Sequence, residues 1–414
     1  MTDPDKFFCV LPFIHFATSV NGEVRLCCKV PVSDSIKINN KRSTLATNSI
    51  KEFWYSDYMD NVREQMILGQ PVKDCKQCYY EDSINLTSKR VNENQYYYDR
   101  YGKEGLAKKI SLKPDMPIYL DLRLGNLCNL KCRMCSTQYS SQHVKEYNDL
   151  VKDYPTLAKD FNETYFGQSQ DDTWFENEEF WKEIDLLAHN VDQLIFAGGE
   201  PTLHPGVFRL LEKCVELGRA KDVRLRLTTN MTNMPQKFVD IIDEFKQVTF
   251  ECSIDGTENV FNYIRHPGNW NSIKENVEKI LPTNAWIMVT STVQIYNFHN
   301  IVELWRWVNS YNRPKLKFYP TLLYSPKYFQ PGLINEKEKG TLIAHIENYM
   351  NSLPETDVNT QIKGRMKSIL EHVALPIEDR EKHIQSLIKI TKAMDDYREE
   401  NIYDISPGWK RWIS

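Results

Sequence analysis

Three cysteines lie within eight residues of this sequence, at Cys128, Cys132 and Cys135. Their spacing is C-x3-C-x2-C, in the stretch LRLGNLCNLKCRMCSTQ. Thiolates are ligands of iron–sulfur clusters and of zinc, and a structural zinc site closes with four ligands. Three thiolates directly after a strand can therefore hold three irons of a four-iron cluster and leave the fourth iron open to another ligand. A zinc site completed by a distant fourth ligand is the alternative.

A second group of cysteines lies near the amino terminus. Four of them have the spacing C-x17-C-x47-C-x2-C, namely Cys9, Cys27, Cys75 and Cys78. Cys28 follows Cys27 directly. Because adjacent residues on a strand point to opposite faces, we expect only one of this pair to bind metal, and we assign Cys27. On spacing alone, a zinc ribbon is the alternative to an iron–sulfur site.

Composition limits the classes of protein that the chain can represent. It has 414 residues, of which 41% are hydrophobic and 12% aromatic, so a packed core is expected and global disorder is not. The formal net charge of −4 gives no argument for nucleic-acid or membrane attraction. No apolar run is long enough to span a bilayer, and the first residues do not form a signal peptide, so we expect a cytoplasmic protein with reduced thiols. In that setting cysteines indicate metal ligands before disulfides, although the isolated Cys214 and Cys252 are predicted to be buried hydrophobic residues.

Elements that could position these thiols follow from the hydrophobic pattern. Residues 1–80 form one unit with helical spacing over 49–70, and residues 81–116 are polar and are expected to be a connector. Over residues 117–330, short β-type runs alternate with helical patterns, which predicts an α/β fold with a parallel sheet or barrel. The runs are IYLDLRL, QLIFAGG, VRLRLTTN, VTFECSID, WIMVTSTVQI and KLKFYP, too few for a complete eight-stranded barrel. Residues 331–414 are predicted to be helices that pack on the barrel flank.

The three-cysteine loop and four later motifs together resemble the radical S-adenosylmethionine (SAM) superfamily. GNLCNLKCRMC matches the superfamily's cysteine signature, and FAGGEPTLHP, TTN, SIDG and STVQIYN follow in the expected order, with YIRHPGNW after SIDG. The resemblance covers roughly residues 117–320. It implies a partial (β/α)6 barrel in which SAM binds the open iron through its amino and carboxylate groups. One electron then splits the SAM sulfonium, and the resulting 5′-deoxyadenosyl radical takes a hydrogen atom from the substrate.

The same resemblance implies roles for individual residues. The backbone of Gly198, Gly199, Glu200 and Pro201 would contact the SAM amino group. Ser253 and Arg265 would bind its carboxylate, and Asp255 or Asn230 its ribose. Thr228 and Gln294, at the ends of the third and fifth strands, complete the expected cofactor-binding set. Taken singly, SIDG is also a good turn sequence and Arg265 could be a surface charge. A reductase, flavodoxin or ferredoxin is the expected electron donor.

The amino-terminal cysteine pattern resembles the SPASM/Twitch auxiliary-cluster module. Its four thiols match the Twitch form, which implies a second [4Fe–4S] cluster held by Cys9, Cys27, Cys75 and Cys78. The module usually follows the barrel, whereas here it precedes it. The expected fold is thus a small α+β Twitch-like module, a partial radical SAM barrel and a helical carboxy-terminal extension.

Strand alternation predicts which side chains line the barrel interior. If Ser253 points inward, Glu251 shares its face and Cys252 does not. By the same rule, polar residues of the other strands face inward: Asp121, Arg123, Arg224, Arg226, Thr228, Thr290, Thr292, Gln294, Lys317 and Tyr319. We select Glu251, Arg226 and Lys317 as candidate catalytic or substrate-binding residues. The alternative is that Asp121–Arg123 and Glu251–Arg226 pairs only neutralise the interior.

The sequence thus predicts an enzyme that abstracts hydrogen from a polar substrate, such as an amino acid, peptide or sugar derivative. With an auxiliary cluster as electron acceptor, the net reaction would be a two-electron oxidation. A radical SAM maturase that crosslinks or epimerises a peptide is the first alternative. A non-catalytic zinc-binding interaction module is the alternative from another class. Neither nucleic acid nor membrane is an expected partner.

Overall fold

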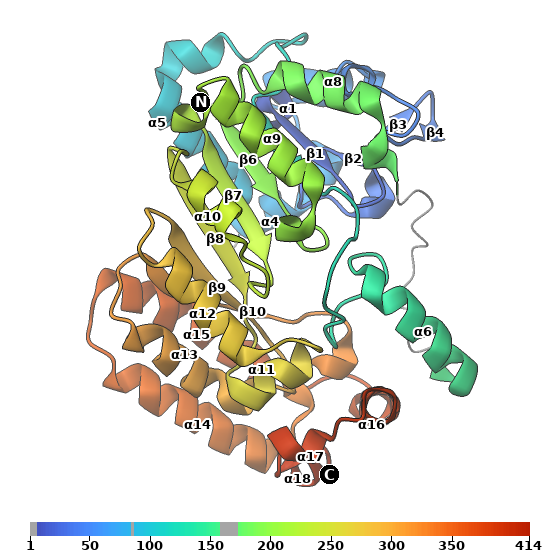
Figure 1. Ribbon diagram of the computed structural model, residues 1–414, viewed down its shortest axis with the longest axis vertical. Helices are drawn as coiled ribbons and strands as arrows, with labels where there is room; N and C mark the ends of the chain where they lie inside the picture. Colours follow the sequence, from blue (N-terminus) through green and yellow to red (C-terminus); the bar gives the residue numbers. More distant parts are fainter. Residues whose placement is uncertain (1–5, 84–86, 158–172) are drawn as a thin grey trace. The chain divides into compact units, whose positions relative to one another are not determined.

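A computed structural model describes residues 6–83, 87–157 and 173–414 of the chain (Figure 1). The chain divides into two compact units. The first consists of residues Met1–Asn126, Ser169–Leu227 and Glu244–Gln247, and the second of Leu127–Gln168, Thr228–Asp243 and Val248–Ser414. Residues 1–5, which belong to the expected amino-terminal module, and residues 84–86 of the expected connector lie outside the described residues.

The sheet of the first unit combines two strands of the amino-terminal segment with three strands of the βα region. Its strand order is β7–β6–β5–β1–β2, with bounds β1 (His15–Thr18), β2 (Val24–Arg25), β5 (Tyr119–Leu122), β6 (Gln193–Phe196) and β7 (Arg224–Thr229). Strand β1 runs parallel to β5, so His15 lies opposite Tyr119. The amino-terminal segment therefore extends the sheet of the βα region, which differs from the separate module that the sequence suggested. All four residues of β1 are buried, so the strand needs a neighbour for its backbone groups, and β5 provides it.

The remaining elements of this unit are mostly helices. They are α1 (Leu11–Ile14), α2 (Ile50–Trp54), α3 (Asp57–Ile67), α4 (Lys76–Ser83), α5 (Lys89–Ala107), α8 (Glu178–Leu187) and α9 (Pro205–Glu216), with a small hairpin of β3 (Lys37–Ile38) and β4 (Lys41–Arg42). Ser49 and Glu52 form a capping box at the start of α2. The helical spacing predicted over 49–70 is thus resolved as α2 and α3, and the expected connector contains the helix α5.

The second unit contains three parallel strands in the order β10–β9–β8. Their bounds are β8 (Gln247–Ser253), β9 (Trp286–Val293) and β10 (Leu316–Leu322). Helices alternate with them along the chain, as expected of βα units: α10 (Gln236–Ile242), α11 (Glu258–Ile264), α12 (Trp270–Ile280) and α13 (Ile301–Ser310). Helix α6 (Ser141–Asp153), which lies between β5 and β6 in the chain, also belongs to this unit. All six predicted strands of the βα region are therefore present, at β5 to β10.

The two faces of β7, β8, β9 and β10 differ in burial with the period of two that the sequence predicts, whereas all four residues of β5 are buried. That the more open face lines a barrel interior stays a prediction. In β8 the side chains alternate between buried and half-buried, so that Glu251 and Ser253 share the more open face and Cys252 is fully buried. The same alternation occurs in β7, β9 and β10. Cys214 and Cys252 are both 0% exposed, as expected for residues that only pack.

The carboxy-terminal extension is helical, as predicted. It comprises α14 (Glu336–Ser352), α15 (Asp357–Ala374), α16 (Arg380–Arg398), α17 (Ile402–Ile405) and α18 (Trp409–Ile413). Helix α15 packs against β10, and α16 packs against α6 within the same unit (Figure 1). The extension therefore covers the edge strand and also reaches the segment that follows the three cysteines.

Among the described residues, none of the helices combines the length and the hydrophobicity that crossing a lipid bilayer requires.

The buried Arg63 joins three helices around Cys9 in the first unit. Its side chain is 0% exposed, and it donates to the carbonyl oxygens of Pro12 at 2.9 Å and Trp54 at 2.7 Å. Its guanidinium also lies 4.4 Å from the centre of the Trp54 ring. Replacing Arg63 with Ala leaves two carbonyls without their donor and opens a cavity, so we expect a loss of about 3 kcal/mol in the free energy of unfolding. Urea denaturation followed by fluorescence measures this loss.

The matched control is Glu64→Ala, since Glu64 is exposed on the same helix α3. The control should change the unfolding free energy by about 0.5 kcal/mol or less. Equal stability of the two variants would contradict the role assigned to Arg63.

Candidate functional site

The three cysteines of the C-x3-C-x2-C motif lie on one loop of the second unit, between β5 and α6 in the chain. Two hydrogen-bond donors approach the sulfur of Cys128: the backbone N–H of Leu130 at 3.5 Å and Nδ2 of Asn230 at 3.9 Å. Asn230 also donates to Oδ1 of Asn129 at 3.0 Å. Donors of this kind stabilise the negative charge of a thiolate ligand and help to set the reduction potential of a cluster.

Arg265 and Asp255 form a buried pair beside Cys132. The guanidinium contacts Oδ2 of Asp255 through Nε and Nη2, both at 2.7 Å, and its Nη1 lies 3.7 Å from the sulfur of Cys132. Oδ1 of Asp255 accepts the backbone N–H of Thr292 at 2.6 Å. Burial raises the pKa of the Asp255 carboxyl, and Arg265 opposes that shift. Burial likewise raises the pKa of the Cys132 thiol, and Arg265 again acts in the opposite direction. The sequence expected Arg265 at a SAM carboxylate; the structure places it between Asp255 and a thiol.

Two further expected SAM-binding residues lie at strand ends of this unit. Gln294 is 0% exposed, and neither polar atom of its side chain has a hydrogen-bond partner within residues 6–83, 87–157 and 173–414. Buried amide groups are normally paired, so an amide in this state fits a residue whose partner is a ligand. Ser253 is half-buried on the same face as Glu251, whose carboxylate accepts the Thr228 hydroxyl at 2.9 Å.

The glycine-rich turn FAGGEP belongs to the first unit, where it closes against the end of β5. Gly198 has a φ of +116°, and a Cβ there would lie 3.0 Å from the carbonyl oxygen of Gly125. The backbone N–H of Gly199 donates to that same oxygen at 3.3 Å. Glu200 is buried and accepts from the backbone and hydroxyl of Thr202 at 3.1 and 2.7 Å, just after Pro201. Position 198 therefore requires glycine, because a side chain would clash with Gly125. The Glu200 carboxylate stabilises the turn through its bonds to Thr202.

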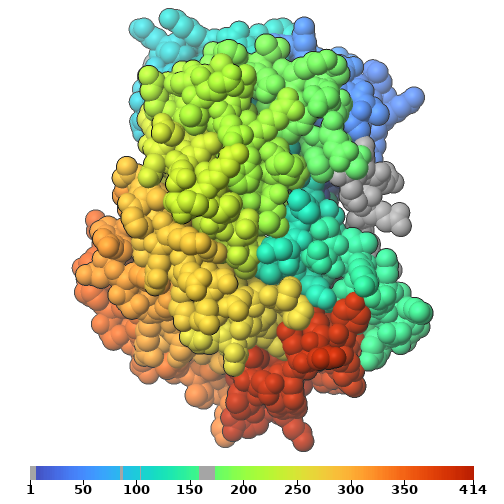
Figure 2. All heavy atoms as spheres, viewed as in Figure 1, coloured from blue at the N-terminus to red at the C-terminus, as the bar shows by residue number. Residues whose placement is uncertain are grey.

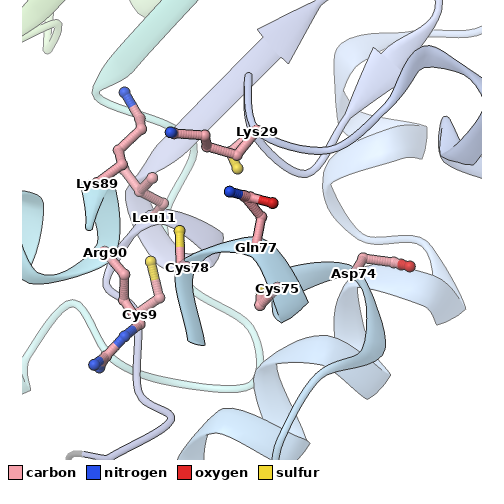
Figure 3. A pocket seen from close by; sticks show the side chains of 10 residues that line it. Cys9, Leu11, Lys29, Asp74, Cys75, Gln77, Cys78, Lys89 and Arg90 are labelled. Atoms are coloured by element: carbon pink, nitrogen blue, oxygen red, sulfur yellow. The ribbon is translucent and has the colours of Figure 1, made fainter. Parts of the chain in front are cut away.

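A cavity in the first unit is lined by four cysteines: Cys9, Cys27, Cys75 and Cys78. They come from three places in the chain, before α1, after β2 and around the start of α4. Figure 3 shows this cavity with Leu11 beside the thiols and the cations Lys29, Lys89 and Arg90 around it. Cys27 lines the cavity and Cys28 does not. Both follow the end of β2, in a bend and a turn, so strand alternation does not separate them, and the assignment of Cys27 stays a prediction.

The chemistry of this donor set fits a four-iron cluster. Burial, and after it the neighbouring thiols, raise the pKa of the Cys27 and Cys75 thiols to about 12 each. Four such thiols can ionise together only if positive charge is placed among them, which iron supplies. Within the described ranges, no three Cys, His, Asp or Glu side chains are arranged to hold a single metal ion. Thiols that surround a cavity match a cluster, because each ligand then binds a different iron.

Two of the candidate interior residues lie on the more open faces of their strands. Arg226 is half-buried on the same face of β7 as Arg224 in the first unit. Lys317 is half-buried on β10 in the second unit, with its Nζ 4.9 Å from the centre of the Trp286 ring. The expected Asp121–Arg123 pair is present at 3.5 Å, so these two charges neutralise each other. Asp121 itself is 2% exposed, which leaves it less accessible than the sequence suggested.

Sequence reasoning missed a set of charged residues that contact the cysteine loop. They are Lys131, Arg133, Glu146, Asp395, Arg398 and Glu400. Arg133 lies inside the cysteine motif, so its position could have drawn attention to it. Its partners are more than 250 residues away in the chain, and no local pattern signals such a contact.

Comparison with known proteins identifies the class of the central region. Residues 122–306 match the family model of the radical SAM superfamily. The chain therefore contains a radical SAM superfamily domain, which agrees with the resemblance carried by its motifs.

Individual relatives match more weakly. The sporulation killing factor maturation protein SkfB of Bacillus subtilis (strain 168) is 23% identical over 195 residues, which are 47% of this chain and 40% of that protein. The match thus spans less than half of the relative's length. Among solved structures, SuiB of Streptococcus suis bound to S-adenosylmethionine is 14% identical, with 71% of this chain and 60% of that chain covered and a TM-score of 0.37. The structure of anSMEcpe with bound AdoMet is 17% identical over 54% of this chain and 57% of that chain, with a TM-score of 0.35. Likenesses with TM-scores this low assign neither reaction nor substrate to this chain.

If each cysteine group holds one four-iron cluster, replacing a ligand should lower the iron content of the protein by a defined amount. Anaerobically reconstituted protein should hold about eight irons and eight sulfides per chain. Replacing Cys132 or Cys75 with Ala should lower both numbers to about four, because each cluster loses one ligand. Iron and acid-labile sulfide assays measure the result.

The matched controls are Cys28→Ala and Cys214→Ala. The first thiol lies outside the cavity lining, and the second is buried in α9. Both variants should retain the full iron content. Zinc without sulfide in the unmodified protein would instead support the zinc-binding alternative.

Proposed function

We propose that this protein is a radical SAM enzyme that abstracts a hydrogen atom from a polar substrate. Its [4Fe–4S] cluster would be held by Cys128, Cys132 and Cys135, with one iron left for SAM. The observation that carries the proposal is the arrangement of this loop: three thiols, two of which receive hydrogen bonds from residues of the other superfamily motifs, Asn230 and Arg265. When bound, cluster and SAM together supply the 5′-deoxyadenosyl radical.

The residues of the chain have defined tasks in this proposal. Arg265 carries a charge beside the Cys132 sulfur, and Asp255 holds it in place through two contacts. The unpaired amide of Gln294 can bond the cofactor, and the half-buried Ser253 can reach its carboxylate. In the other unit, the Gly198–Gly199 turn presents backbone groups where a side chain would clash with Gly125.

We also propose that the four-cysteine cavity of the first unit holds an auxiliary [4Fe–4S] cluster. The ligands would be Cys9, Cys27, Cys75 and Cys78, and the nearby Lys29 and Lys89 would balance part of the negative charge of the thiolates. Such a cluster supplies an acceptor for one electron. Loss of a hydrogen atom, then of one electron and one proton, makes the substrate reaction a two-electron oxidation.

A peptide is a second candidate substrate, in a maturation reaction such as crosslinking or epimerisation. It is favoured by the similarity to SkfB, which is named as a maturation protein. Within the second unit, the half-buried polar residues of β8 and β10 are compatible with either a peptide or a small polar molecule. Hydrogen transfer distinguishes the two, since deuterium from the true substrate appears in 5′-deoxyadenosine.

The central prediction concerns SAM cleavage. Reconstituted protein with dithionite and SAM should release 5′-deoxyadenosine and methionine, and the Cys132→Ala variant should release neither above background. Liquid chromatography with mass spectrometry measures both products. Protein with intact clusters that releases no 5′-deoxyadenosine would refute the proposed activity.

Arg226 and Lys317 are expected to act on the substrate rather than on SAM. Replacing either with Met should lower product formation about a hundredfold, since a charged contact to the substrate is lost, while SAM cleavage without product continues. The control is Arg313→Met, at an exposed position before β10. If both variants keep full product formation, these side chains do not contact substrate.

A further inference from the structure

The cysteine loop contains a completely buried cation, Arg133, which lies between Cys132 and Cys135 in the sequence. Arg133 is 0% exposed at its side chain, and its guanidinium lies 3.5 Å from the centre of the Tyr263 ring. Nη2 of Arg133 contacts Oδ1 of Asp395 at 2.5 Å and Oε2 of Glu400 at 2.6 Å. Both carboxylates come from the end of α16 and the residues after it. A buried charge of this kind is tolerated only when it is paired, so the loop depends on these distant partners.

A second buried pair holds the same loop from its other side. Arg398, the last residue of α16, contacts Oε1 of Glu146 on α6 at 2.6 Å, and both side chains are 1% exposed or less. Its Nη2 also donates to the backbone carbonyl of Lys131 at 2.7 Å. Lys131 in turn places its Nζ 2.8 Å from Oε2 of Glu146. Arg398 therefore bonds the main chain of the loop directly.

The same carboxy-terminal residues hold the segment that carries Arg265. Glu400 bonds the ring of His266 at 2.6 Å while it also contacts Arg133. Between these contacts, the backbone N–H groups of Lys131 and Arg133 donate to the carbonyls of His266 and Ile264 at 2.7 and 2.8 Å. The residues on either side of Cys132 are thus tied to those on either side of Arg265.

The charges in this network balance. Lys131, Arg133 and Arg398 are cations, and Glu146, Asp395 and Glu400 are anions. Figure 2 shows the red carboxy-terminal atoms packed against the teal atoms of the segment that contains α6. Removing one partner leaves an uncompensated buried charge, so we expect the loss of one contact to weaken the other contacts of the network as well.

We propose that Asp395, Arg398 and Glu400, here named the carboxy-terminal clamp, are positioning residues of the cysteine loop. They act through the neighbours of Cys132: Arg398 bonds the carbonyl of Lys131, and Asp395 and Glu400 pair Arg133. They fix the backbone that presents the Cys132 sulfur, and they fix the distance from that sulfur to Arg265. The helical extension is therefore a part of the cluster site as well as a cover for the barrel flank. The clamp rests on the proposed cluster for its function, although its effect on the loop can be measured without iron.

The first test uses the apo protein and the alkylation of cysteines by iodoacetamide, followed by peptide mass spectrometry. Cys132 is 7% exposed, so its alkylation requires the loop to open. In Glu400→Gln and Arg398→Met, alkylation of Cys132 should become about tenfold faster or more, because a buried charge loses its partner. Cys214 is an internal reference, since it is fully buried in α9 and reacts only when that region unfolds. Equal acceleration at Cys132 and Cys214 would indicate general destabilisation and overturn the proposal.

The second test uses reconstituted protein and the electron paramagnetic resonance spectrum of the reduced cluster, recorded with and without SAM. The clamp variants should change the spectrum and its response to SAM, while Arg398→Lys, which keeps the charge, should restore part of both. The matched control Glu399→Gln, at an exposed neighbouring residue, should leave spectrum and alkylation unchanged. Wild-type spectra and wild-type alkylation in Glu400→Gln and Arg398→Met would overturn the clamp. A wild-type protein that forms no cluster would instead refute the proposed function.

Discussion

The structure around the cysteine loop depends on the pairing of one buried charge. Arg133 cannot reach water, and its cost of burial is met by Asp395, Glu400 and the face of Tyr263. Both carboxylates belong to the region after the last strand, where the last turn of α16 lies close to the loop. Helices α14 and α15 lie between β10 and α16 in the chain.

Both cysteine groups contain buried thiols whose ionisation is costly, and different neighbours surround the thiols in each group. The three-cysteine loop receives its donors from residues of its own unit, Asn230 and Arg265, one on each of two sulfurs. The four-cysteine cavity is surrounded by the side chains of Lys29, Lys89 and Arg90. In each case desolvation opposes ionisation of the thiols, and a nearby cation acts against it: Arg265 at Cys132 and Lys89 at Cys27. Gln294 differs from these charged groups, since its buried amide is neutral and has both N–H donors and an acceptor oxygen without a partner in the described part of the chain.

Local sequence rules predicted most of the elements correctly. Alternation placed Glu251 and Ser253 on one face of β8 and Cys252 on the other, because successive side chains of a strand point in opposite directions. The rule does not apply to Cys27 and Cys28, because both lie in the bend and turn after β2. The rules were weaker at the amino terminus, where β1 joins the parallel sheet beside β5 instead of belonging to a separate module. That pairing links His15 to Tyr119 across a hundred residues, and its energy comes from backbone groups that every residue carries.

The sequence by itself determined which residue types are available: the three cysteines of one loop, the strands that alternate with helices, and the glycine-rich turn. These features are set by residue type and short-range spacing, whereas the cavity gathers its four cysteines from three places in the chain. Only the tertiary structure decided that Arg265 lies between Asp255 and the Cys132 sulfur, and that Arg133 and Arg398 are paired by residues from opposite ends of the second unit. The physical reason is that a buried ion pair depends on distance in space, and its two partners leave no periodic signal in the sequence.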